Sequence, residues 1–329
     1  MKKVVSKVDP QFDFSAGKKY VSIDLEFIEL DTVCDQEIYL YTHDRYVLYR
    51  GANVPFTLQD KLRLDSSKTK FIYIFCENEQ QLRRFYEKNL TNIIENDKVP
   101  TQKKADVLYR CALGIAQDIF ERPDHAETMH RSKGVVDCTI RLLFKDSNAF
   151  ANMINLSGHD YYTYTHSVNV LTFTLSLLSS LGFKDQKFLK DAGMGALLHD
   201  VGKSKVPIAI LNKPSKLTEE EWAVMKNHPV FGAEIVEKAK MPERGVDVIV
   251  QHHERVNGKG YPHGLYGEAI PIASQVVSLV DAYDAMTSDR VYQKARKPFE
   301  AMRIISQEMK DHYNPGMVET FIRMLNLKK

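Results

Sequence analysis

Runs of apolar residues change their period along this chain, and the change divides it into a strand-rich part and a helix-rich part. Up to residue 76, short runs rich in β-branched and aromatic residues have the alternation or continuity of strands. Two helices are expected between or after them, over 57–64 and, capped by Asn78, over 80–86. The pattern therefore predicts a small α/β domain over 20–95. Its strands are expected at 20–25, 37–41, 45–50 and 71–76, the last in the interior of the sheet.

The rest of the chain has apolar residues spaced by three and four positions, which is typical of amphipathic helices. The polar segment 96–104 is expected to link the small domain to these helices. We therefore predict a mostly α fold, in which a C-terminal all-α bundle follows a small N-terminal α/β domain. The expected parts are a flexible arm over 1–19, the small domain over 20–95, a linker and helices over 96–150, and the bundle over 151–329. Helices are expected at 104–122, 135–144, 161–181, 185–198, from Thr218, and at 242–253, 271–286, 299–309 and 318–325.

Composition narrows the class of protein. Of the 329 residues, 43% are hydrophobic and 27% are charged, which is ordinary for a soluble globular chain. The net charge of +2 gives no field to attract a nucleic acid polymer. No signal peptide is expected after Met1, and the apolar stretch 168–181 is too short and polar to span a membrane. Four scattered cysteines without a CxxC motif predict reduced thiols and a cytoplasmic location.

Histidines and aspartates gather in the helical region at positions that predict burial. Asp200 follows an apolar helix and Asp281 interrupts a run of valines, so each carboxylate needs a cation or hydrogen-bond donors. Five histidines lie at expected helix ends or on apolar faces, and His228 is placed at the end of the Thr218 helix. By contrast, His125 and His130 lie in a polar connection and are interpreted as surface residues. The seven candidate metal ligands are His166, His199, Asp200, His228, His252, His253 and Asp281.

Each of these residues alone is more often an ordinary core or surface residue than a ligand. Their occurrence together in one region favours a metal site, because imidazole and carboxylate groups are both good ligands. Seven nitrogen and oxygen ligands exceed the number that one zinc site uses. Two ions that share a bridging carboxylate fit better, and such a pair is suited to attack on phosphorus.

Several motifs around these residues occur in a characteristic order and spacing, and in them the chain resembles the HD-GYP family of the HD phosphohydrolase superfamily. The resemblance covers roughly residues 155–325, and residues 20–95 resemble the small domain that often precedes HD-GYP domains. The matching residues are His166, His199-Asp200-Val201-Gly202-Lys203, Leu211 to Thr218, His228-Pro229, His252-His253-Glu254, Gly258-Lys259-Gly260-Tyr261-Pro262 and Asp281 to Thr287.

The resemblance implies a bacterial enzyme that hydrolyses cyclic di-GMP to pGpG, and perhaps further to GMP, by means of a metal-bridging hydroxide. It implies that one ion is held by His166, His199, Asp200 and Asp281. Asp200 would bridge to a second ion held by His228, His252 and His253. Iron or manganese is expected by this resemblance, while nitrogen and oxygen ligands also suit zinc, nickel and magnesium.

Further roles follow from the same resemblance. Lys203 would neutralise the scissile phosphate, and Asp200 and Lys203 would form the catalytic pair. Arg290, with Lys294 nearby, would hold the other phosphate, and Tyr261 would contact the substrate. The loop Gly258–Pro262 is also credited in the family with contacts to partner domains. The small domain is consistent with regulation, homodimerisation or ligand sensing, and equally with a structural appendage.

Two positions depart from the family pattern. Members with three metals carry a glutamate one helical turn before the first histidine, where this chain has Tyr162. We therefore expect two metals. After Arg290, Gln293 occupies the usual place of a basic residue, and Lys294 follows it. This departure keeps a second hypothesis open, a weakly active or inactive cyclic di-GMP receptor. A third hypothesis is an HD hydrolase for another nucleotide, such as 3′,3′-cGAMP.

Overall fold

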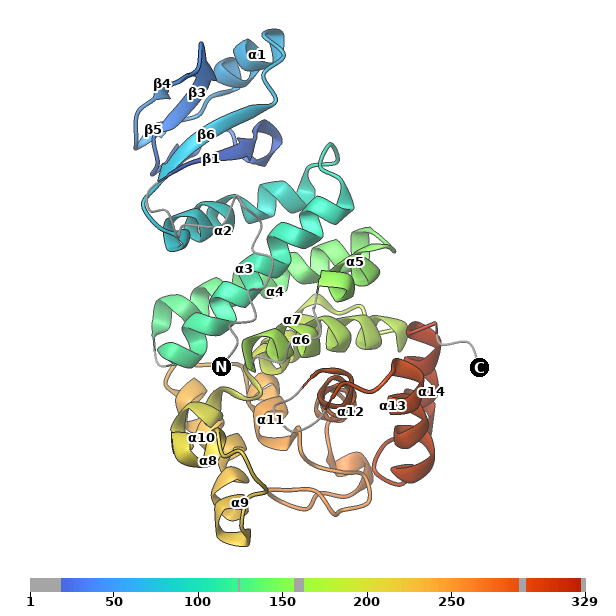
Figure 1. The fold of residues 1–329 in the computed structure, drawn as a ribbon. Helices are drawn as coiled ribbons and strands as arrows, with labels where there is room; N and C mark the ends of the chain where they lie inside the picture. Colours follow the sequence, from blue (N-terminus) through green and yellow to red (C-terminus); the bar gives the residue numbers. More distant parts are fainter. Residues whose placement is uncertain (1–18, 124, 157–162, 290–293, 327–329) are drawn as a thin grey trace. The chain divides into compact units, whose positions relative to one another are not determined.

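The computed structural model describes residues 19–123, 125–156, 163–289 and 294–326 (Figure 1). The chain divides into two compact units, residues 1–107 and 108–329. The division falls within helix α3 (Thr101–Glu121). The mostly α fold with a small N-terminal sheet is confirmed.

The first unit contains a four-stranded antiparallel sheet in the order β1-β6-β3-β4. Strand β6 lies between β1 and β3, and its continuous apolar run correctly predicts an interior position in the sheet. Its residues Ile72, Ile74 and Cys76 alternate onto one buried face. Because successive side chains of a strand point to opposite faces, this face forms the core of the unit. The strands are β1 (Lys19–Asp24), β3 (Ile38–Thr42), β4 (Arg45–Arg50) and β6 (Phe71–Cys76), with a separate pair β2 (Val33–Cys34) and β5 (Val54–Pro55).

Two helices complete this unit, and both begin at the caps that their sequences suggest. Helix α1 (Leu58–Ser66) starts with a capping box between Thr57 and Asp60. Helix α2 (Glu79–Glu95) starts at Asn78, whose side chain accepts a hydrogen bond from the backbone N–H of Gln81. The apolar face of α2, from Leu82 to Ile94, is buried and packs in the core with β6.

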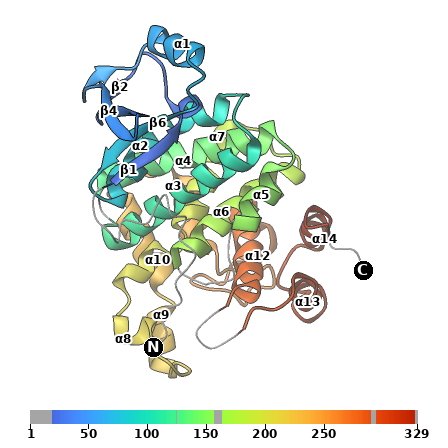
Figure 2. The ribbon, with the colours of Figure 1, turned by 45° about the horizontal axis from the view of Figure 1, so that its top comes forward.

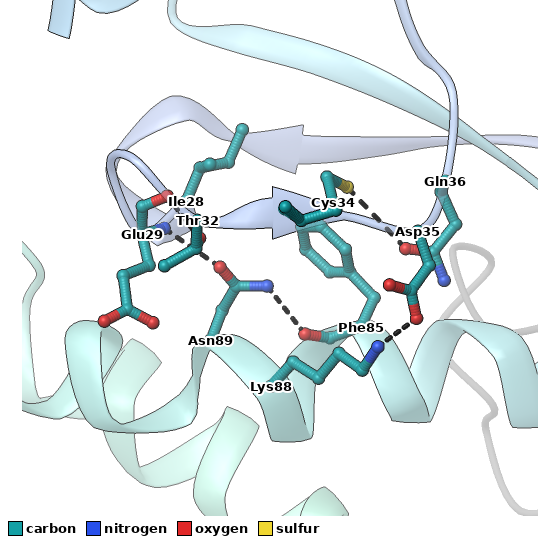
Figure 3. Close-up of a pocket in the computed structure, with 10 residues that line it drawn as sticks. Ile28, Glu29, Thr32, Cys34, Asp35, Gln36, Phe85, Lys88 and Asn89 are labelled. Atoms are coloured by element: carbon teal, nitrogen blue, oxygen red, sulfur yellow. Dashed lines mark hydrogen bonds and ion pairs between the residues drawn. The ribbon is translucent and has the colours of Figure 1, made fainter. Parts of the chain in front are cut away.

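A cavity of about 190 Å³ lies between the segment 28–36 and α2 (Figure 3). The polar groups around it satisfy one another. The side-chain oxygen of Asn89 accepts the Glu29 backbone N–H at 2.9 Å, and Lys88 forms an ion pair with Asp35. Burial raises the pKa of the Cys34 thiol, so this thiol stays protonated and poorly nucleophilic at neutral pH.

The second unit is helical, and α12 (Ile272–Thr287) runs through its centre. Figure 1 views α12 nearly along its axis, and α6, α11 and α13 contact it from different sides. Figure 2 shows the same bundle turned by 45°. Its other helices are α4 (Ala126–Lys145), α5 (Ala149–Leu156), α6 (Thr163–Ser180), α7 (Gln186–Leu198), α8 (Ile208–Leu211), α9 (Glu219–Met225), α10 (His228–Glu237), α11 (Glu243–Gln251), α13 (Pro298–Arg303) and α14 (Pro315–Met324), with 3₁₀ turns η3 (Val201–Lys205) and η4 (Gly267–Ala269).

Several boundaries differ from the sequence predictions, and α2, expected over 80–86, runs on to Glu95. Helix α4 begins at Ala126 and not at 135, so His130 lies inside a helix, although it is exposed as expected. His228 does not end the Thr218 helix, because α9 stops at Met225 and His228 opens α10. The proline that follows it favours the first turn of a helix, where its missing N–H costs nothing. The helix predicted over 299–309 gives way to a π-helical turn, Ile304–Glu308.

Among the described helices, none combines the length and the apolar character needed to cross a membrane.

Candidate metal centre

Five helices bring the seven candidate ligands to one place in the second unit. α6 carries His166 and α12 carries Asp281, while His199 and Asp200 directly follow α7. The remaining three lie at a helix start and a helix end: His228 opens α10, and His252 and His253 follow α11. Adjacent histidines inside a helix point about 100° apart. At the end of α11 their rings come together, with centroids 4.1 Å apart.

A glycine allows the turn after Asp200 to approach α10. A Cβ at Gly202 would lie 1.9 Å from the carbonyl oxygen of His228 and 2.4 Å from the backbone nitrogen of Gly232. No side chain fits in that space, so η3 and the first turn of α10 pack backbone to backbone. This contact holds Asp200 beside His228.

The first group of ligand atoms comes from α6, α7 and α12. The Nε2 atom of His166 lies 3.1 Å from Oδ1 of Asp281 and 3.2 Å from Nε2 of His199. His166 and His199 are 1% and 0% exposed, and Asp281 is 8% exposed. These three residues offer ligand atoms within 4.8 Å of one another.

The second group comes from α10 and the end of α11. The Nε2 atoms of His228 and His252 lie 3.2 Å apart, and His253 completes the set of atoms within 4.8 Å. His253 is half-buried at the edge of the group, with its Nδ1 3.9 Å from Oδ2 of Asp281.

Asp200 lies between the two groups. Its Oδ1 faces Nε2 of His228 at 3.3 Å, and its Oδ2 faces Nε2 of His199 at 3.4 Å. The side chain is 1% exposed, and its Oδ1 atom has no hydrogen-bond donor among the described residues. Lys203 forms an ion pair with Oδ2. A buried carboxylate oxygen without a donor is costly, so Oδ1 is suited to bind a cation.

The imidazoles are oriented from behind. The Nδ1 atoms of His199, His228 and His252 lie 2.7–2.8 Å from the backbone carbonyl oxygens three residues earlier in the chain. A carbonyl can only accept, so each Nδ1 carries the proton and each neutral ring has a bare Nε2. Two bare nitrogens at 3.2 Å, as in His228 and His252, cannot hydrogen-bond to each other.

A metal ion between those nitrogens, or a proton on one ring, would relieve their repulsion. Burial, and after it the neighbouring His199 and His228, hold the pKa of His252 well below its ordinary value. Burial likewise lowers the pKa of His253, with His252 as the next cause. The rings therefore resist protonation, and the donor set fits a metal ion.

The carboxyl groups of Asp200 and Asp281 are also in the ionised form that binds metals. Burial by itself would raise the pKa of Asp200, but the charge of Lys203 and the neighbouring histidines outweigh it and hold that pKa well below the usual range. For Asp281 burial is again outweighed, mainly by the neighbouring His166, and its pKa is also well below the usual range. Neutral imidazoles and ionised carboxylates are the forms that bind metals.

One functional residue was missed by sequence reasoning. Asp284 is 2% exposed, and its Oδ2 accepts the Nδ1–H of His166 at 2.7 Å. Its Oδ1 accepts the side-chain amide of Asn169 at 2.9 Å. A carboxylate behind a metal-binding histidine fixes the direction of the ring. The available signal was its position one helical turn after Asp281 in an apolar helix.

The loop that contains Tyr261 closes one side of the second group. The ring of Tyr261 stacks on that of His253, with centroids 4.7 Å apart and planes inclined by 28°. Glu254, 1% exposed, holds the chain that follows by accepting the backbone N–H groups of His263, Gly264 and Leu265. The loop is therefore tied to the same helix end that carries the histidines.

The other predicted substrate contacts, Arg290 and Lys294, are not brought to the site by the described part of the chain. Arg290 lies outside the described residues, as do Tyr162 and Gln293, so the predictions that rest on those positions stay predictions. Lys294 is exposed, and the described part of the chain records no contact between its side chain and the metal-binding groups.

The model of the family described as "HD domain" matches residues 148–317, more than half of the chain. The chain belongs to the HD domain family. The match spans all seven candidate ligands.

Relatives of this HD domain chain include two bacterial proteins named cyclic di-GMP phosphodiesterases. The one from Pseudomonas aeruginosa is 37% identical over 202 residues, which cover 61% of this chain and 48% of the relative. The one from Thermotoga maritima is 35% identical over 167 residues, which cover 50% of this chain and 45% of the relative. The chain thus spans about half the length of these curated relatives.

A solved structure shares the fold. Bd1817, an HDG"Y"P protein from Bdellovibrio bacteriovorus, superposes with a TM-score of 0.64 at 23% identity, covering 94% of this chain and 100% of that one. The family match confirms the resemblance to the HD superfamily, and the solved structure shows that the fold is shared.

Proposed function

We propose that this protein is a metal-dependent phosphodiesterase that hydrolyses cyclic di-GMP to the linear dinucleotide pGpG, with GMP as a further product. The observation that carries the proposal is the position of Asp200, whose two oxygens face two separate groups of buried histidines. The names of the two relatives support the choice of substrate.

The two groups suggest how the ligands are shared. His166, His199 and Asp281 would hold one ion, and His228, His252 and His253 the other, with Asp200 as the bridge. Two divalent ions bound there would supply an activated water and polarise a phosphate oxygen. Iron or manganese is our expectation for both ions, and Tyr162 in place of a glutamate is the reason for expecting two.

Lys203 lies where it can act on a phosphate bound at these groups. Its ammonium already contacts Oδ2 of Asp200, at the boundary between the two ligand sets. A phosphate that enters would offer it a second anion at the same place. Lys203 would then neutralise charge on the scissile phosphate and stabilise the leaving ribose oxygen.

Tyr261 is suited to donate a hydrogen bond to the substrate. Burial, followed by the negative charges of Asp281 and Asp200, raises the pKa of its phenol, which stays protonated at any physiological pH. The hydroxyl is therefore a neutral donor beside the second group. Arg290 and Lys294 remain our predicted contacts for the other phosphate.

The decisive experiment combines metal analysis with turnover. The protein is purified under reducing, anaerobic conditions, loaded with iron or manganese, and assayed for loss of cyclic di-GMP and formation of pGpG and GMP. We expect about two metals per chain. Asp200→Ala should lose metal from both groups and lower turnover by at least ~1000-fold, because the bridge is lost with the charge it supplies. Asp247→Ala, which removes a carboxylate from α11 outside the candidate ligands, is the matched control.

Other results would change the conclusion. Unchanged turnover in an Asp200→Ala variant that has lost both metals would end the metal-assisted mechanism. Tight binding of cyclic di-GMP without product, in metal-loaded protein, would make the chain a receptor. Faster hydrolysis of 3′,3′-cGAMP than of cyclic di-GMP would reassign the substrate. A metal count near three would refute the argument from Tyr162.

A further inference from the structure

The rim of the metal centre contains an exposed cation between two aromatic rings. The Lys226 ammonium lies 5.9 Å from the centroid of Tyr261 and 6.0 Å from the centroid of Trp222. Tyr261 in turn stacks on His253, one of the candidate ligands. Lys226 is therefore adjacent to the second group while remaining open to solvent.

The local fold brings these two side chains together. Trp222 and Lys226 are four residues apart at the end of α9, so they share one face of the helix. The start of α9 is held by the capping box between Thr218 and Glu221, and Lys213 pairs with Glu221 at 2.5 Å. Two residues after Lys226 the chain reaches His228 and enters the metal centre.

The chemistry of this rim favours an anionic ligand with a flat ring. Within the described residues no carboxylate pairs with Lys226. Its charge is therefore stabilised only by water and by the aromatic faces. Trp222 is 45% exposed, which is a large apolar surface to leave in water. An ammonium binds phosphate as a point charge, and an indole stacks on a nucleobase.

We propose that Lys226 and Trp222 form a substrate subsite, in which Lys226 binds the phosphate that is not cleaved and Trp222 stacks on a guanine base. This inference rests on the proposed function. A cyclic dinucleotide carries two phosphates on opposite sides of its ring. When one lies between the ligand groups at Lys203, the other lies outside them, and Lys226 is a cation placed at that rim.

Another occupant of this surface is a protein partner. Ile208 and Leu211, in the short helix α8, are 74% and 37% exposed, and α8 contacts α9. Trp222 lies on α9, so a protein partner could cover exposed apolar side chains of both helices. The charge of Lys226 and its position near the Tyr261 ring, which stacks on His253, favour the nucleotide. The experiment separates the two occupants.

Trp222 is the single tryptophan of the chain, so intrinsic fluorescence reports directly on this subsite. Metal-loaded protein is titrated with a hydrolysis-resistant phosphorothioate analogue of cyclic di-GMP. We expect saturable quenching in the wild type. Lys226→Met should raise the Kd of the analogue by roughly 10- to 100-fold, the loss expected for one charged hydrogen bond. Lys226→Arg should restore much of the affinity.

Steady-state kinetics with cyclic di-GMP give a second readout. Lys226→Met and Trp222→Ala should raise KM about 10-fold or more and change kcat less, because both residues hold parts of the substrate that do not react. Trp222→Phe should keep KM near that of the wild type, since a smaller ring still stacks. Far-UV circular dichroism and metal content show that each variant is folded and loaded.

Lys238→Met is the matched control. Lys238 follows the C-terminal end of α10, roughly 15 Å from the His228 end at 1.5 Å per residue. The substitution removes the same charge as Lys226→Met but should leave Kd and KM unchanged. Unchanged Kd and KM in Lys226→Met and Trp222→Ala, with normal turnover by the wild type, would overturn the subsite alone and leave a protein partner as the occupant. Loss of metal from Lys226→Met would also overturn it. A wild type that neither binds nor hydrolyses a cyclic dinucleotide would overturn the proposed function as well.

Discussion

At the scale of single residues, the direction of each histidine ring is set by the group behind it. Three of the rings donate their Nδ1–H to backbone carbonyls three residues earlier in the chain, which no side-chain substitution can remove. His166 differs, because its Nδ1–H goes to the carboxylate of Asp284 on another helix. The effect of the supporting group on ring orientation can therefore be tested at His166, by substituting Asp284.

Asp284→Asn is expected to weaken the first metal group without removing a ligand. The amide has one acceptor oxygen, so it can serve either His166 or Asn169 but not both. We expect metal affinity at this group to fall by roughly 10- to 100-fold, the usual effect of losing such a partner. Metal titration of the metal-free variant measures the change. Turnover should recover as metal is added, and a loss of turnover at full metal occupancy would contradict a positioning role.

The residues themselves differ in how far the sequence predicts them. Asp281 was predictable because a carboxylate within a run of valines must be buried, and burial requires a cation or donors. The same reasoning applies to Asp284, but a helix of period 3.6 places both on one face and does not say which of them faces a metal. The partner of Asp284 is 118 positions earlier in the chain, at His166, and no local pattern reveals so distant a contact.

At the scale of elements, the centre depends on helix ends that meet without intervening side chains. η3 and α10 approach closely enough at Gly202 that any Cβ would overlap the His228 carbonyl. Helix periodicity predicted α7 and α11 well, because each has apolar residues that are buried in the bundle. It placed His228 at the wrong kind of helix end, since two residues separate α9 from α10 and only Pro229 marks the new start.

Gly202→Ala is expected to destabilise the second unit. Its Cβ would force η3 away from α10, and overpacking of this kind costs about 1–3 kcal/mol. The movement would also separate Asp200 from His228, so metal at the second group should be lost before metal at the first. Chemical denaturation and metal analysis of the variant measure both effects.

Gly134→Ala is the matched control for this substitution. Gly134 lies in the middle of α4, and a Cβ there meets nothing within 4 Å. Because glycine is a poor helix residue, alanine should stabilise the protein by about 0.5–1 kcal/mol and leave metal content unchanged. Equal stability of the two variants would contradict the steric argument at Gly202.

At the scale of the whole molecule, the change of hydrophobic period separated sheet from bundle, but it did not give the order of the strands. The alternating or continuous apolar runs at β1, β3, β4 and β6 predict that each is a strand. They do not show that β6 enters between β1 and β3. That choice depends on contacts between residues far apart in sequence, as does the convergence of five helices on Asp200.

The ligand groups also tie the stability of the metal-free protein to pH. The pKa values of His252 and His253 are lowered in the folded state by burial, from an ordinary value of 6.5. Below that pH these two histidines bind protons in the unfolded chain but stay neutral in the folded chain, so unfolding is favoured. The pKa values of Asp200 and Asp281 are also lowered, from 3.8, and their stabilisation is lost only as the pH falls below that value.

We therefore expect metal-free protein to keep a constant Tm from about pH 8 to 7 and to lose stability below about pH 6.5. Each histidine contributes up to about 1.4 kcal/mol per pH unit. Thermal denaturation in the presence of a chelator, at constant ionic strength, measures the slope. His252→Asn should reduce the slope because one titrating ring is gone. His125→Asn, which removes an exposed histidine just before α4, should leave it unchanged. A Tm that stays constant down to pH 5.5 would contradict the burial of neutral imidazoles, and with it the physical reason for placing metal ions between them.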